Sequence, residues 1–213
     1  MPKVKMPKNS PSLDMTPMVD LAFLLVTFFM LTTQFRPDEP VVVDSPSSIS
    51  EKILPDKVML VTIDSTGRVF FNLEGKVMRK KMLGQMGAKY GVTFDEKETN
   101  RFALMTTFGM TVQQLKQYIP MDEMERKDFM KKSQGIPYDS LNNQLGDWIR
   151  FGRLAEAEIS GAAPVDKTKG LRFAIKGDGN ANYTAIKRVI EVFQEMKVNR
   201  FNLVTTLEQH PNI

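Results

Sequence analysis

The most informative part of the sequence is an apolar segment near its start, DMTPMVDLAFLLVTFFMLTT, which covers residues 14–33. Its longest apolar run extends from Leu21 to Leu31, and the natural limits of the segment are Pro17 and Thr33. As a helix, residues 17–33 would rise roughly 26 Å, which is the lower edge of what spans the hydrocarbon core of a bilayer. We therefore expect one transmembrane helix over residues 15–35, tilted or in a thinned bilayer.

The charges on either side of this segment predict its orientation. Lysines at positions 3, 5 and 8 precede it, and one arginine and two acids follow it within residues 36–39. The positive-inside rule then leaves the tail of residues 1–14 in the cytoplasm and exports the bulk of the chain. The competing interpretations are a soluble core helix and a cleaved secretory signal. A signal is disfavoured because no pair of small residues follows Leu31 for a signal peptidase.

Composition excludes several classes of function. The chain has 213 residues and a mean hydropathy of −0.25, so it is not built mostly of membrane helices. Its 29 basic and 25 acidic residues leave a nearly neutral body, whereas nucleic-acid binding needs a concentrated cationic face. The chain lacks cysteine, and its one histidine is His210, close to the C-terminus. This argues against thiolate metal sites, histidine-based zinc sites and most hydrolytic chemistry. We expect a protein that is not an enzyme and uses no metal or cofactor.

Asp20 stands at the front of the apolar run. An acid inside a membrane segment costs roughly 2.5 to 3.5 kcal/mol and is usually functional. The alternative is an acid at the start of the helix, level with the lipid headgroups, because Thr16 is a good N-cap and Pro17 a good first helical residue. In a capping box, however, the acid would stand at the position of Val19. Taken alone, the residues leave both interpretations open.

The run from Asp14 to Met30 resembles the single transmembrane segment of the ExbD/TolR family. In that family a Thr-Pro pair precedes a membrane aspartate by three or four positions, and a Phe-Met or similar pair follows about ten later. Asp20, Phe29 and Met30 occupy those places, while Asp14 replaces an asparagine found in many members.

The resemblance implies a subunit of an inner-membrane motor driven by the proton-motive force. Two such helices, one from each chain of a homodimer, lie inside a ring of an ExbB- or TolQ-like polytopic partner. Asp20 would be the proton carrier, and Thr16, Pro17 and Thr27 would belong to the proton path or to helix packing. Thr27 lies two turns beyond Asp20 on the same face, although a membrane threonine often bonds its own i−4 carbonyl instead, here that of Phe23.

The same resemblance implies partners and a location for the rest of the chain. A periplasmic domain would deliver force to a TonB- or TolA-like protein and so energise outer-membrane transport. Two alternatives stand beside this interpretation. One is a TolR-like subunit that maintains envelope integrity by binding peptidoglycan. The other is a passive, membrane-tethered periplasmic binding module, in which Asp20 only sits at the membrane interface.

Residues 36–56 read as an extended linker, because prolines and serines recur at a spacing that no helix tolerates. Within the linker, residues 41–43 are three valines that favour a β-strand. We expect either a stiff spacer or a strand that docks on a sheet edge of the dimer or of a partner, with Val41, Val43 and Pro46 in contact.

Residues 57–207 have the pattern of a folded α/β domain, and residues 208–213 form a tail. A hairpin is expected over 58–63 and 68–73, with a turn at Asp64-Ser-Thr-Gly67. Further on, we expect a helix over 138–159, a strand over 171–176, an amphipathic helix centred on Val189 and a last strand over 201–207. In the first helix, the residues expected to face inward are Leu141, Leu145, Trp148, Ile149 and Leu154. This β-β-α-β-α-β order predicts a two-layer α/β sandwich and matches the small periplasmic domain of the same family.

Residues 76–137 form an insertion that the family's usual length does not require. It holds eight of the 15 methionines and a capping box at Thr111 and Gln114, so several short helices are expected. Flexible hydrophobic packing is a commoner role for such methionines than metal binding. We expect an accessory subdomain or a partner surface.

Overall fold

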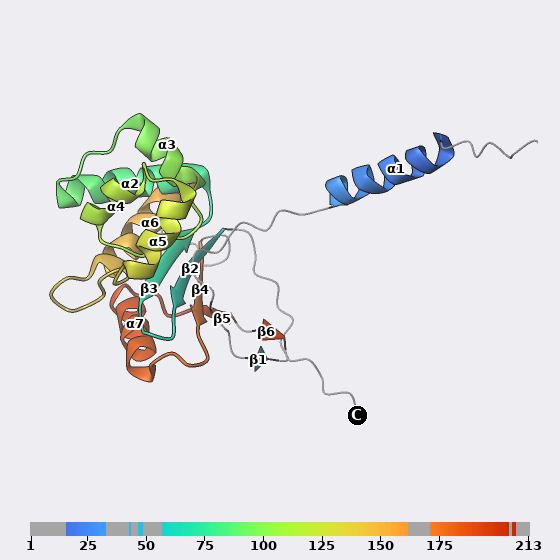
Figure 1. Ribbon diagram of the computed structural model, residues 1–213. Coiled ribbons are helices and arrows are strands. Elements are labelled where there is room, and N and C mark those ends of the chain that lie inside the picture. The colour runs from blue at the N-terminus through green and yellow to red at the C-terminus, as the bar shows by residue number, and fades with distance from the viewer. Residues whose placement is uncertain are drawn as a thin grey trace, which may run out of the picture. The chain divides into compact units, whose positions relative to one another are not determined.

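The computed structural model describes residues 16–32, 43, 47–48, 57–161, 171–204 and 206–207 (Figure 1). The chain divides into two compact units, Met1–Asp38 and Glu39–Ile213. The first unit contains one described element, the helix α1 (Thr16–Thr32). The second contains a four-stranded sheet, a small two-stranded sheet and the remaining helices.

The four-stranded sheet has the strand order β3-β2-β4-β5. The strands are β2 (Val58–Ile63), β3 (Val69–Leu73), β4 (Arg172–Gly177) and β5 (Asn202–Val204). β2 and β3 are antiparallel, as predicted for the hairpin, and Gly67 supplies the positive φ of 83° that the turn requires. β4 is parallel to both β2 and β5. The sheet is therefore mixed, with its central strands joined by helical crossovers.

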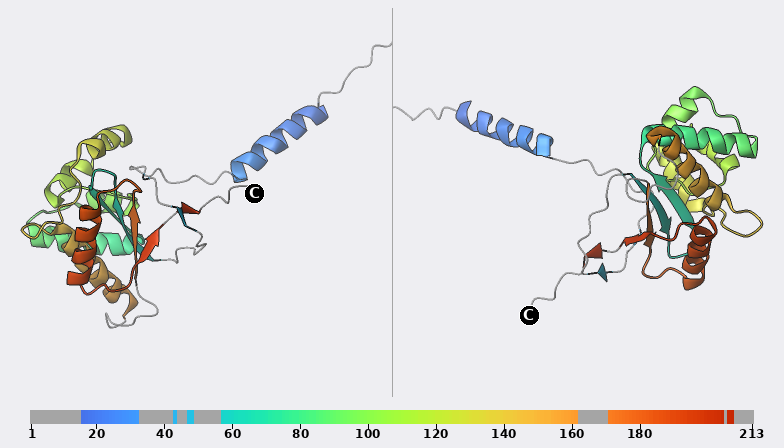
Figure 2. Two further views of the ribbon diagram at one scale, coloured as in Figure 1. Left: turned by 90° about the horizontal axis from the view of Figure 1, so that it is seen from below. Right: turned by 180° about the vertical axis from the view of Figure 1, so that it is seen from behind.

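Helices cover one face of this sheet (Figure 2), which confirms the two-layer α/β domain. α6 (Gln144–Ser160) approaches the hairpin closely, because a Cβ at Gly152 would overlap the Met59 side chain and lie 3.6 Å from Leu73. α7 (Tyr183–Glu195) packs through Phe193, whose ring centre lies 6.0 Å from that of Phe173 on β4. The predicted inward face of α7 is confirmed by buried Val189 and Phe193.

The helix predicted over 138–159 begins later than expected. Asn143 caps α6 by accepting a hydrogen bond from the Gly146 amide at 2.9 Å, so the residues before it form a loop. Leu141 lies in that loop and is fully exposed, and its predicted inward position is wrong. Leu154 is also misplaced, because its side chain is 40% exposed. The predicted burial of Leu145, Trp148 and Ile149 is confirmed.

The insertion forms four helices, which are α2 (Lys76–Tyr90), α3 (Glu96–Leu104), α4 (Val112–Tyr118) and α5 (Glu123–Lys132). The predicted capping box opens α4, where Thr111 and Gln114 bond each other's backbone amides. Met82 and Met86 on α2 are fully buried in the same cluster as Trp148 of α6. The insertion therefore contributes to the same described core as the rest of this domain, and its role as an accessory subdomain or partner surface stays a prediction.

The insertion also closes one edge of the sheet. Phe108 exchanges two backbone hydrogen bonds with Phe71 of β3, at 2.8 and 3.1 Å. The Ile136 amide donates to the Val69 carbonyl at 2.9 Å, further along the same edge. Phe71 and Phe108 also pack with Trp148, with ring centres 6.1 and 4.8 Å from the indole. β3 therefore carries insertion backbone along its outer side, which leaves fewer groups free for another strand.

The last predicted strand corresponds to two described elements. Its first part is β5, in the main sheet, and its second part is β6 (Thr206–Leu207). β6 pairs in parallel with β1 (Ser47–Ser48), a strand from the linker region, and the two form a separate sheet. The predicted last strand therefore contributes to two different sheets, and Thr205 between β5 and β6 lies outside the described residues.

Candidate functional site

α1 contains the residues predicted for the proton path, which are Thr16, Pro17, Asp20 and Thr27. Apart from Thr16, Asp20, Thr27 and Thr32, every residue of α1 is apolar or proline. None of its residues is buried, and its leucines, valines, methionines and phenylalanines are all more than half exposed within the single chain. A helix that is apolar on all sides requires an apolar environment, either from other helices or from lipid.

Asp20 is the one ionisable residue of α1, and it lies one turn inside the helix. α1 begins at Thr16, and its first turn contains no acid. Asp20 is therefore not placed to bond the free amides at the helix start, which was the structural alternative to a functional role. Pro17 occupies the second helical position, where its missing amide hydrogen leaves no bond unmade.

Thr27 follows Asp20 by seven residues and shares its face of the helix. Its hydroxyl donates to the carbonyls of Phe23 and Leu24, at 3.0 and 2.9 Å. The hydroxyl hydrogen is thus directed at the helix backbone, while the oxygen can still accept a hydrogen bond. A relay through Thr27 would have to use that accepting side or a rotated hydroxyl, and the relay stays a prediction.

α1 is 17 residues long. Within the described ranges, none of the helices combines the length and the apolar character that a bilayer crossing demands.

The predicted partner-binding residues lie in the linker. Val41 and Pro46 are outside the described residues. Val43 is described and is buried, with 8% of its surface exposed. Its side chain is therefore not presented to a partner in this conformation, and its partner-binding role stays a prediction.

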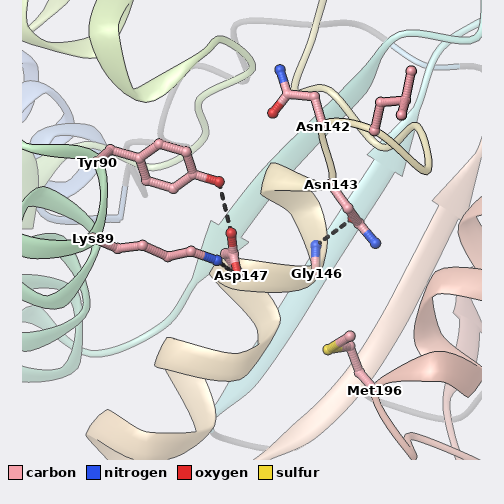
Figure 3. A pocket seen from close by; sticks show the side chains of 8 residues that line it. Lys89, Tyr90, Asn142, Asn143, Gly146, Asp147 and Met196 are labelled. Carbon is pink, nitrogen blue, oxygen red and sulfur yellow. Dashed lines mark hydrogen bonds and ion pairs between the residues drawn. The ribbon is translucent and has the colours of Figure 1, made fainter.

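A feature that the sequence did not reveal is a shallow pocket of about 320 Å³ between α2, α6 and the end of α7 (Figure 3). Asp147 of α6 accepts a hydrogen bond from the Tyr90 hydroxyl at 2.6 Å and pairs with Lys89, both from α2. Burial, together with the bond to Asp147 and its charge, raises the pKa of Tyr90, so the phenol stays protonated and donates. These polar groups satisfy one another and join two helices.

The pocket could not be predicted from local sequence patterns, because its residues on α2 and on α6 are more than fifty positions apart in sequence. In the described part of the chain, no cluster of acids and histidine is placed to hold a metal ion.

A comparison with protein-family models covers residues of both units. The family model described as biopolymer transport protein ExbD/TolR matches residues 6–208, so the chain belongs to this family. The match includes α1, the linker and the α/β domain with its insertion. Members of the family are membrane-associated transport subunits of proton-driven motors rather than enzymes, and they work with ExbB/TolQ-type and TonB/TolA-type partners. No curated protein and no solved structure gave a significant match.

Proposed function

We propose that this chain is the inner-membrane subunit of a proton-driven motor, in which Asp20 takes up and releases the protons. The observation that carries this proposal is one acid, Asp20, within a helix that is otherwise apolar on all sides. Such a helix has no need of an acid for its own folding, since Asp20 lies beyond the positions that cap the helix. Membership of the ExbD/TolR family supports the same role.

The energies involved favour a switch at this position. An ionised acid in a membrane helix costs roughly 2.5 to 3.5 kcal/mol, and a proton crossing about 150 mV releases about 3.5 kcal/mol. The cost of the ionised acid and the energy released by one proton are similar. One proton is therefore sufficient to shift Asp20 between contact with a polar group of the ring and contact with its apolar side chains. Alternation between these two states would make the helix step or rotate within its ring.

The proposed setting is a single crossing of the inner membrane. α1 rises roughly 26 Å, which suits a tilted helix or a locally thinned bilayer. The lysines at positions 3, 5 and 8 favour a cytoplasmic N-terminus and a periplasmic domain. The exposed apolar side chains of α1 would be covered by a second copy of the helix and by an ExbB- or TolQ-like ring.

In the proposed motor, the periplasmic domain transmits force to a TonB-like protein. An extended partner segment would bind most simply by adding a strand to a sheet edge. The β3 side carries Phe108 and Ile136 from the insertion, whereas β5 is the terminal strand on the other side, with Leu203 60% exposed. We therefore place the strand-docking role at the β5 side, with the linker segment of Val41, Val43 and Pro46 or a TonB-like strand as the occupant.

The proposal is tested by comparing Asp20→Asn with Asp20→Glu in cells whose own copy of the gene is deleted. A motor loses proton-dependent transport with asparagine, which cannot ionise, and keeps part of it with glutamate. A passive tether works equally well with both variants. Copurification of an ExbB- or TolQ-like chain in detergent provides an independent check, and its absence for the wild-type protein would contradict the proposed assembly.

A further inference from the structure

The helix α2 carries cations that are not used inside the folded unit. It contains five basic residues and no acid. Three of these cations have partners, because Lys81 and Lys89 form ion pairs with α6 and Arg79 donates to backbone carbonyls of β3 and of the end of α3. The other two, Lys76 and Lys80, are exposed and have no ion-pair or hydrogen-bond partner among the described residues.

The same charges oppose the stability of α2. The N-terminus of a helix is the positive end of its dipole, where acids stabilise and cations destabilise. The neighbouring helices α3 and α5 follow this rule, with two acids each in the first turn and a capping box. α2 begins instead with Lys76, and it has neither an acid in its first turn nor a side-chain cap. Unfavourable charges without a local role are expected at binding surfaces.

The two lysines belong to a face of α2 that is otherwise small or apolar. Val77, Lys80, Gly84 and Ala88 recur at helical spacing and are all exposed, whereas the methionines of α2 lie on its buried side. Val77 is 59% exposed, and a Cβ at Gly84 would meet nothing within 4 Å in the described part of the chain. Together with Lys76, these four residues are called the α2 outer face below.

Exposed apolar side chains beside lysines without partners suit the surface of an anionic bilayer. Leu154 of α6, 40% exposed, lies one turn before Glu158, which pairs with Lys81, so Leu154 adjoins the α2 outer face. At a bilayer surface, apolar side chains enter the headgroup region while lysines stay close to the phosphates, and both contribute to binding. A protein partner would need side chains to interlock with, and Gly84 and Ala88 offer almost none.

We propose that the α2 outer face binds the surface of an anionic lipid bilayer. The proposal rests on the membrane setting proposed for α1, but not on proton transfer by Asp20. Because α1 would anchor the chain in the same bilayer, the contact is intramolecular, and a weak face is enough to populate it. Each lysine at an anionic surface strengthens binding about fivefold, so Lys76 and Lys80 together contribute about 25-fold.

The contact can be measured with the full chain reconstituted in vesicles. The chain has no cysteine, so Gly84→Cys provides a single thiol at the centre of the face for an environment-sensitive fluorophore. Met124→Cys on α5, at 84% exposure, is the matched control site. Vesicles of phosphatidylcholine are compared with vesicles of equal parts phosphatidylcholine and phosphatidylglycerol. Both contain a spin-labelled lipid that quenches the fluorophore on contact.

We expect the label at position 84 to be quenched in the anionic vesicles and much less in the neutral ones, with little quenching at position 124 in either. Lys76→Gln with Lys80→Gln should lower the bound-to-free ratio about 25-fold, and high salt should lower it as well.

A matched charge control removes two lysines elsewhere in the insertion. Lys97→Gln with Lys132→Gln changes exposed positions of α3 and α5 and should alter the ratio by no more than about twofold, because salt screens charges away from the contact. Unchanged Trp148 fluorescence of the unlabelled variants shows that they are folded.

Equal quenching of the two labels in anionic vesicles would overturn the proposal, and so would quenching that survives the loss of Lys76 and Lys80. If the same lysine changes instead release the ring partner during copurification in detergent and leave quenching unaltered, the face binds protein, which also overturns the proposal. Flotation with neutral vesicles reports separately whether α1 inserts. Failure of the proposed membrane setting is therefore distinct from failure at this face.

Discussion

Replacing Asp64 by alanine tests how the insertion is joined to the hairpin. Asp64 is 4% exposed, and one of its oxygens accepts hydrogen bonds from the Thr66 amide and hydroxyl and from the Arg68 amide, at 2.7 to 2.9 Å. The other oxygen pairs with the Arg68 guanidinium at 2.6 Å. Arg68 in turn donates to the carbonyls of Lys131, in the last turn of α5, and of Ser133, just beyond its end. One carboxylate thus orients the cation that holds the insertion against the sheet.

The magnitude follows from the groups left unpaired. Asp64→Ala removes the acceptor for the backbone amides of exposed Thr66 and half-buried Arg68. A fully buried donor left unsatisfied costs about 1 to 3 kcal/mol, and the cost here lies at the lower end because these amides can regain water. It also breaks an ion pair, but the Arg68 side chain is 28% exposed and regains water. We expect a total loss of about 2 kcal/mol in the free energy of unfolding, a substantial share of the roughly 5 to 15 kcal/mol typical of a domain.

Urea unfolding of the full chain in detergent measures this loss. Trp148 is the single tryptophan and is fully buried, so its fluorescence reports unfolding of the α/β domain without a contribution from α1. The matched control is Asp128→Ala on α5, because the Asp128 side chain is 72% exposed and we expect a change within about 0.5 kcal/mol. A loss at Asp64 no larger than at Asp128 would refute the role given to this carboxylate.

The same variant has a predictable pH dependence. Burial by itself would raise the pKa of Asp64, but the bonds from Thr66 and Arg68 and the Arg68 charge outweigh it, so the pKa lies below the ordinary 3.8. A lowered folded-state pKa gives stability that is complete above the unfolded-state pKa and is lost as the pH falls through the folded-state value. The difference in unfolding free energy between wild type and Asp64→Ala should therefore be constant above about pH 4 and shrink as the pH falls below it, and a difference that stays constant well below pH 4 would contradict the assignment.

Two further predictions compare matched positions in the insertion. Gly109→Ala should lower the free energy of unfolding by about 1 to 3 kcal/mol, because its Cβ would overlap the ring of Phe70. Gly84→Ala should raise it by about 0.5 to 1 kcal/mol, because Gly84 lies inside α2 with open space around it. Met130→Ala should cost about 2 to 4 kcal/mol because Met130 is 1% exposed, and Met124→Ala, at 84% exposure, should change stability by less than about 0.5 kcal/mol. Urea unfolding followed by Trp148 fluorescence measures all four, and equal effects within either pair would contradict the packing described.

Elements with a local signal could be predicted from the sequence. The hairpin followed from apolar runs around Asp64-Ser-Thr-Gly67, and α7 from apolar residues at helical spacing. The capping box at Thr111 and Gln114 gave the start of α4. Leu141 was misplaced because its neighbours continue a helical pattern, while Asn143 starts the helix two residues later with a side-chain cap.

Features formed by distant segments could not be predicted in this way. Phe108 reaches Phe71 across 37 residues, and Ile136 reaches Val69 across 67, with no turn chemistry or periodicity to announce either contact. The pairing of β1 with β6 joins segments near opposite ends of the folded unit in sequence. Each strand has two residues, which is too short to show the alternation of apolar and polar residues that predicts a strand. For α1, the motif around Asp20 identified the family, and the structure adds that the helix begins at Thr16 and leaves its first turn without an acid.

Proton transfer by Asp20 is the central claim of the proposed function. The most direct measurement is proton flux through the purified complex of this chain with its ring partner, reconstituted in vesicles with an imposed potential. We expect Asp20→Asn to abolish the flux and Asp20→Glu to retain part of it, with both variants assembling normally. Undiminished flux with Asp20→Asn would show that another group carries the protons and would contradict the proposed function.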